Sequence, residues 1–150
     1  MKRVIPLLII IFTLSANGQN REEIISLMNE YGENYGKPNY SFDFIDGKLN
    51  PGIIKIEKII CENNDTILFD CFLEMILKTK DSANETPSNI LGGIFICNPG
   101  LVKNRLTEKY KDEFLINLLE FGFNNRTYDR KEEIKNYAEL EKQLNQLNNN

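Results

Sequence analysis

Apolar and polar residues alternate in the middle of the chain, in the pattern that is typical of β-strands. In residues 66–78 every odd position is apolar, whereas Asp70, Glu74 and Lys78 fall on even positions. A period of two predicts a strand with one apolar face. Residues 40–44 alternate in the same way and are also predicted as a strand. Residues 53–61 are predicted as a strand because they are rich in isoleucine, although their apolar spacing would suit a short helix too, and residues 94–97 are predicted as a short buried strand.

Helical spacing appears on either side of these segments. Asn20 and Glu23 form a predicted helix cap, and apolar residues then recur at helical intervals as far as Tyr31. From Val102 to Leu118 apolar residues recur at steps of four, which predicts one long helix beginning near residue 99. A last helix with a thin apolar stripe is predicted over residues 130–147, and residues 79–89 are predicted as a polar surface loop.

These elements predict an α+β fold. An antiparallel sheet of three to four strands would pack against two amphipathic helices, with an extra C-terminal helix. Residues 19–125 would form a single domain, and residues 126–150 the last helix and a polar tail. The paired glycines at 92 and 93 predict a close backbone approach or a bulge before the strand at 94–97.

The first 18 residues have the layout of a secretory signal peptide. Lys2 and Arg3 precede a nearly unbroken apolar run over residues 4–14, and the small residues Ala16 and Gly18 follow it. The run is shorter than the roughly 20 residues that a membrane-spanning helix needs. We therefore expect cleavage after Gly18 and a periplasmic or secreted mature protein, with an uncleaved anchor as the alternative.

Composition narrows the chemistry further. The chain of 150 residues contains no His, which excludes a Ser-His-Asp triad, a His-ligated metal and a His proton shuttle. Its formal charge is -4, and loss of the leader would leave 16 basic and 22 acidic side chains, a charge of -6. An acidic chain without a basic run argues against nucleic-acid binding.

Three cysteines, Cys61, Cys71 and Cys97, leave at least one thiol unpaired. If the first two lie on strands joined by a turn, their spacing places them too far apart for a disulfide. Pairing of Cys71 with Cys97 across neighbouring strands is the predicted alternative, and three buried thiols remain equally compatible with the sequence.

Candidate catalytic and metal-binding residues are few. On one strand Asp70 and Glu74 would lie about 13 Å apart, which is too far for a carboxylate pair that shares a proton. A calcium site formed by Asp43, Asp46 and Asp65 is one alternative, but turn formation explains all three residues. No Gly-rich phosphate loop or serine nucleophile motif is present in the sequence, so no cofactor, metal or catalytic residue is predicted.

Aromatic residues supply the remaining functional signal. Tyr31, Tyr35 and Tyr40, together with Phe42 and Phe44, could line a recognition groove, or the two phenylalanines could be core residues that the tyrosines surround. The predicted last helix offers a second interface. Its candidate residues are Tyr137, Leu140 and Leu144.

Two functional classes follow from these patterns. The first is a non-enzymatic module that binds another secreted or envelope protein. The second is a hydrolase that acts on an extracellular glycan through carboxylates alone, which would require two converging acids, one with a raised pKa.

Overall fold

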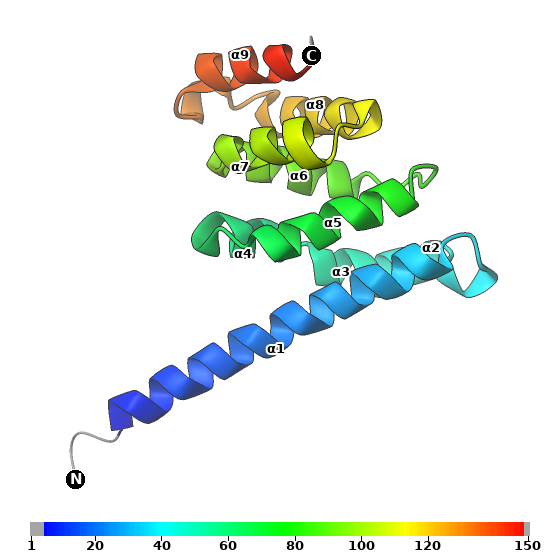
Figure 1. The fold of residues 1–150 in the computed structure, drawn as a ribbon, viewed down its shortest axis with the longest axis vertical. Coiled ribbons are helices and arrows are strands. Elements are labelled where there is room, and N and C mark those ends of the chain that lie inside the picture. The colour runs from blue at the N-terminus through cyan, green and yellow to red at the C-terminus, as the bar shows by residue number, and fades with distance from the viewer. Residues whose placement is uncertain (1–4, 149–150) are drawn as a thin grey trace.

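The computed structural model describes residues 5–148, and these residues form helices and short connections only (Figure 1). The predicted α+β fold is therefore wrong, since no strand occurs in the described range. The elements are α1 (Ile5–Asn34), η1 (Pro38–Tyr40), α2 (Phe42–Phe44), η2 (Ile45–Leu49), α3 (Asn50–Ile53), α4 (Ile56–Asn63), α5 (Thr66–Lys78), α6 (Thr86–Cys97), α7 (Pro99–Asn104), η3 (Arg105–Lys109), α8 (Glu113–Thr127), η4 (Lys131–Glu133) and α9 (Tyr137–Asn148).

The helices stack in chain order, from α1 at one end of the molecule to α9 at the other (Figure 1). Helix α1 packs against α3 and α5, α4 against α6, α6 against α8, and α8 against α9. One continuous set of buried apolar side chains runs through the stack, from Ile24 on α1 to Leu147 on α9. The last helix is therefore part of the same core as the rest of the chain.

Helix α5 replaces the strand predicted at residues 66–78. Its buried positions follow a helical repeat: Leu68, Phe69, Phe72, Leu73, Met75 and Ile76. The polar residues Asp70, Glu74 and Lys78 are four apart, which places them on the opposite face of a helix. Asp65 caps the helix by accepting a hydrogen bond from the backbone N–H of Leu68 at 3.0 Å.

The segment predicted as a strand at 40–44 is also helical, and this changes the environment of its two phenylalanines. A strand would place Phe42 and Phe44 on the same face. In the helical segment Phe44 is 8% exposed, whereas Phe42 is 67% exposed, because residues two apart point in nearly opposite directions on a helix.

The predicted strands at 53–61 and 94–97 lie in helices as well. Residues 53–61 span the end of α3 and most of α4, which agrees with the helical alternative for this segment. Residues 94–97 form the last turn of α6, which begins inside the predicted loop at Thr86. Pro87 lies in the first turn of α6, where its missing N–H has no consequence.

The long helix predicted from residue 99 exists but is interrupted. Helix α7 passes into the π-helical turn η3, whose characteristic hydrogen bond joins the N–H of Tyr110 to the carbonyl of Arg105 at 2.8 Å. The chain is extended at Asp112, which then caps α8 by accepting from the N–H of Phe114. The polar residues at this interruption have the spacing expected for the exposed face of a continuous helix. The hydrophobic periodicity therefore gives no indication that the helix is interrupted here.

The predicted terminal helices are present with different boundaries. Helix α1 begins at Ile5 and runs without a break through the predicted cleavage point at Gly18. The last helix begins at Tyr137, because Asn136 adopts a left-handed conformation with φ of 62°. Residues 1–4 of the predicted leader and 149–150 of the predicted tail lie outside the described residues.

Candidate binding groove

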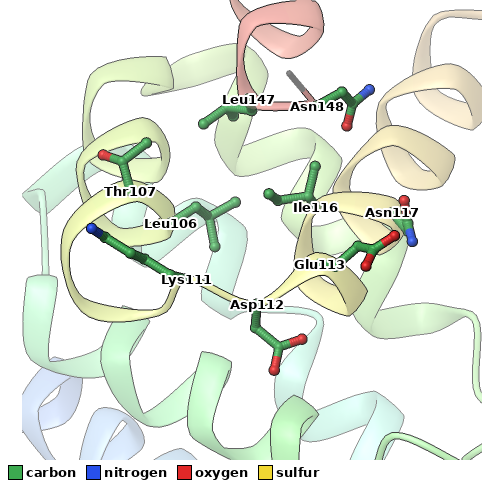
Figure 2. Close-up of a pocket in the computed structure, with 9 residues that line it drawn as sticks. All are labelled: Leu106, Thr107, Lys111, Asp112, Glu113, Ile116, Asn117, Leu147 and Asn148. Carbon is green, nitrogen blue, oxygen red and sulfur yellow. The ribbon is translucent and has the colours of Figure 1, made fainter. Parts of the chain in front are cut away.

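A groove opens between η3, the beginning of α8 and the end of α9 (Figure 2). Its volume of about 720 Å³ lies within the roughly 300–1,000 Å³ that is usual for ligand pockets. Leu106, Ile116 and Leu147 contribute apolar side chains from the three elements. Leu106 and Leu147 are buried at the base, and Ile116 is only partly buried. The groove therefore has an apolar base assembled from two consecutive elements, η3 and α8, and from α9 near the end of the chain.

The rim of the groove is polar. Its remaining lining residues are Thr107, Lys111, Asp112, Glu113, Asn117 and Asn148. Asn148 donates a hydrogen bond to Glu120 at 3.0 Å, which ties the end of α9 to α8. The hydroxyl of Thr107 donates to the carbonyl of Lys103 at 2.9 Å. These contacts hold two sides of the rim in place.

The π-helical turn η3 divides its side chains between the groove and the neighbouring helix α5. Leu106 faces the groove, whereas Arg105 and Lys109 contact Asp70 on α5, with N–O distances of 2.8 and 3.0 Å. π-Helical turns occur frequently at functional sites. Here the turn fixes one wall of the groove, since both of its cations are held by the same carboxylate.

A buried tyrosine reinforces this wall. Tyr110 is 8% exposed and donates its hydroxyl hydrogen to Glu74 at 2.9 Å. Burial raises the pKa of Tyr110 above its ordinary value, so the phenol is the donor at neutral pH. Asp70 and Glu74 were predicted to lie about 13 Å apart on a strand, but they are neighbours on one face of helix α5. Through their contacts with Arg105, Lys109 and Tyr110 they hold the wall of the groove that η3 forms.

Asp112 anchors the other wall. Its carboxylate lies 2.6 Å from the ammonium of Lys80, whose hydrogen bond lowers the pKa of Asp112. Lys80 also lies over the ring of Phe114, 5.6 Å from its centre. The start of α8 is thus held by a residue from the loop that precedes α6.

Of the aromatic residues predicted to form an interface, Tyr31 lies in the core and Tyr35 and Tyr40 are partly buried against it. Tyr31 is buried, stacks on Phe44 with ring centres 5.9 Å apart, and shares a hydrogen bond with Ser82. Tyr35 packs edge-on against Tyr31, and the ring of Tyr40 lies 4.7 Å from that of Phe44. This arrangement matches the alternative in which the tyrosines surround core phenylalanines, except that Phe42 points outward.

The candidate interface residues of the last helix pack against other parts of the same chain. Leu140 and Leu144 are each 4% exposed, and Tyr137 stacks on Phe123 of α8 at 5.7 Å. The packing of these residues against the rest of the chain places Leu147 in the groove. Leu147 belongs to the apolar stripe from which the last helix was predicted. The sequence did not predict that the other groove residues lie together. They come together only because the predicted long helix is interrupted between η3 and α8.

The cysteines pair differently from the prediction. Cys61 and Cys97 form the disulfide, with Cα atoms 5.8 Å apart, and Cys71 is a free, partly buried thiol whose pKa is raised by burial. The predicted Cys71–Cys97 bridge assumed strands. In the helical fold Cys61 and Cys97 lie at the ends of the adjacent helices α4 and α6, where Asn98 also donates a hydrogen bond to Asn64. A disulfide is compatible with a secreted protein.

The acidic residues considered for calcium do not gather. Asp43 and Asp46 are exposed near α2, whereas Asp65 binds the guanidinium of Arg21 through two hydrogen bonds of 2.5 and 3.1 Å. Within residues 5–148 no group of three or more metal-ligating side chains is arranged to hold an ion. In the same range no helix is both long and apolar enough to cross a membrane.

Comparison with known proteins gives no relative. No protein-family model matches the chain, and no curated protein or solved structure is significantly similar to it. The groove and its charges are therefore the basis for a functional proposal.

Proposed function

We propose that this protein is an exported, non-enzymatic binding module that accepts a segment of another secreted or envelope protein in the groove of Figure 2. The observation that carries the proposal is the apolar base formed by Leu106, Ile116 and Leu147 beneath a polar rim. A partly apolar concavity with a few polar groups around it is the usual form of a recognition site.

Export rests on the sequence of the leader and is compatible with the disulfide. Cleavage after Gly18 would shorten α1 but would leave Ile24, Met28 and Tyr31, which are buried in the core. The mature chain would therefore keep the part of α1 on which α3 and α5 pack.

The alternative function, a carboxylate-dependent hydrolase, draws less support from the charges. A general acid in such an enzyme needs a raised pKa. The pKa values of Asp65 and Asp112 are lowered by their hydrogen bonds to Arg21 and Lys80. Asp70 is likewise paired with two cations. These carboxylates are arranged as structural ion pairs.

A pull-down from envelope extract tests the proposal, with the mature protein as bait. Deleting residues 126–150 would remove buried Leu140, Leu144 and Leu147, so a point variant is preferable. Asn117→Trp would fill the mouth of the groove, and Asn125→Trp introduces the same side chain at an exposed position elsewhere on α8.

The proposal predicts a partner that wild type and Asn125→Trp retain and that Asn117→Trp loses. Identical partner lists from all three proteins would contradict it. Release of reducing sugar from an isolated glycan by the wild-type protein would favour the hydrolase instead.

A further inference from the structure

We infer that the groove selects a chain segment in which an apolar side chain lies between an acidic and a basic group. This inference rests on the proposed function and specifies the chemistry of the partner. It follows from the placement of Lys111 and Glu113, the two residues that flank Asp112 at the rim.

The backbone conformation of Asp112 determines where its neighbours point. Asp112 is extended, with φ of -132° and ψ of 119°. In extended chain, successive side chains point to opposite sides and residues two apart share a side. Asp112 also lines the groove, but its carboxylate is directed towards Lys80, whereas the side chains of Lys111 and Glu113 leave the chain on the other side and line the groove (Figure 2).

The two charges are available to a ligand. Asp112 is neutralised by Lys80, whereas neither Lys111 nor Glu113 forms an ion pair with another residue in the range 5–148. Both side chains are exposed, and in Figure 2 they extend towards different sides of the cavity, with Leu106 and Ile116 between them. A ligand that follows this order would present an acid to Lys111, an apolar group to the base, and an amine or guanidinium to Glu113.

Size and charge favour a peptide segment over a single small ion. The volume of about 720 Å³ is sufficient for a few residues, and, with Asp112 paired to Lys80, Lys111 and Glu113 leave one unpaired charge of each sign at the rim. Two acids or two bases would each meet one like charge, which lowers affinity. We therefore expect recognition of an unlike charge pair that brackets an apolar side chain.

Capped pentapeptides test this chemistry with the intact mature protein at low ionic strength. The probe is Ac-Glu-Gly-Leu-Gly-Lys-NH2, and its comparators carry two Glu, two Lys or two Gln at the ends, or Ser in place of Leu. Binding is measured by chemical-shift titration of the methyl groups of Leu106, Ile116 and Leu147. The probe should bind two- to fivefold more tightly than each like-charged peptide, which is about the effect of one exposed ion pair, and the Ser peptide should not shift these methyl groups.

Charge variants give the sharper result. Lys111→Glu should transfer the preference to the peptide with two Lys, whereas Lys135→Glu, a matched change at an exposed residue outside the groove, should not. Glu113→Gln should reduce the advantage of the Lys end, whereas Glu23→Gln should leave it unchanged. High salt should equalise all the peptides that contain Leu.

The outcomes separate this inference from the proposed function. Equal binding of all Leu peptides, unaffected by Lys111→Glu, would overturn the charge selection but leave the groove as a binding site. Methyl groups that respond to no peptide would overturn the inference. If Asn117→Trp also retained every partner in the pull-down, the proposed function would fail with it.

Discussion

Gly92 on α6 and Gly122 on α8 lie at a close contact between the two helices. A Cβ atom on Gly92 would collide with the backbone of Gly122, and a Cβ on Gly122 would collide with the carbonyl of Ser88. Neither clash could be relieved by rotating a side chain, because the opposing atoms are backbone. Helices α6 and α8 can approach this closely only because both positions lack a side chain.

Gly122→Ala should therefore destabilise the protein. We expect the free energy of unfolding to fall by about 1–3 kcal/mol, the usual cost of inserting an atom into a packed contact. Thermal and denaturant unfolding would measure the change.

Gly100→Ala provides the control, because a Cβ there would meet no atom within 4 Å. Gly100 lies in α7, where alanine is favoured over glycine, so stability should stay the same or rise by up to about 1 kcal/mol. Equal losses in both variants would show that α6 and α8 are not in backbone contact.

The disulfide between Cys61 and Cys97 should contribute substantially to stability. It closes a sequence separation of 36 residues that includes all of α5. The double variant Cys61→Ala/Cys97→Ala should lose about 2–4 kcal/mol of unfolding free energy, because the unfolded chain regains the entropy that the link removes. Cys71→Ala should lose less, since it only removes a partly buried thiol.

Peptide mapping checks the connectivity directly. Digestion of the oxidised protein without reductant, after alkylation, should yield one cross-linked peptide pair that contains Cys61 and Cys97, with the alkyl label on Cys71. A bridge to Cys71, or three labelled cysteines, would refute the pairing.

Stability should fall in acid, partly because of the ion pair between Arg21 and Asp65. The hydrogen bond from Arg21 lowers the pKa of Asp65 in the folded protein, whereas the unfolded value is about 3.9. A lowered folded pKa means that the contribution is complete above the unfolded pKa and disappears as the pH falls through the folded one. Asp65→Asn, which retains a capping side chain, should cost about 1 kcal/mol at neutral pH.

Denaturant unfolding across the acid range tests the sign of this effect. The difference between wild type and Asp65→Asn should be constant above about pH 5 and should disappear as the pH falls through the lowered folded pKa of Asp65, below which Asp65 is protonated in both states. Asp43→Asn, at an exposed carboxylate, should show no comparable difference. A difference that grows as the pH falls would contradict the assigned ion pair.

Local features of the chain were more predictable than its fold class. The apolar positions from Ile24 to Tyr31 and the stripe from Leu140 to Leu147 are buried helix faces, as their spacing indicates. The close approach expected at Gly92 is also present, although a helix rather than a strand surrounds it. Such features depend on interactions within a few turns of one helix, so the sequence contains them directly.

The strand assignments failed because α5 and α6 are apolar around most of their circumference. In a helix buried between two neighbours, nearly every position is apolar, and such a sequence fits a period of two as well as a period of 3.6. At residues 66–78 the deciding signals were Asp65 as a cap and the spacing of four between Asp70, Glu74 and Lys78. The spacing of four between these polar residues fits the helical period of 3.6 and gives them one common face, opposite the buried residues.

The lack of histidine, the leader pattern, the net acidity and the buried faces of the outer helices can all be recognised in the amino-acid sequence. Tertiary structure alone decided which cysteines are joined and where a groove opens. The disulfide depends on α4 and α6 ending side by side, and the groove depends on three elements meeting at the interruption around Asp112. Both properties arise from contacts between residues that are distant in the chain, and no local pattern records them.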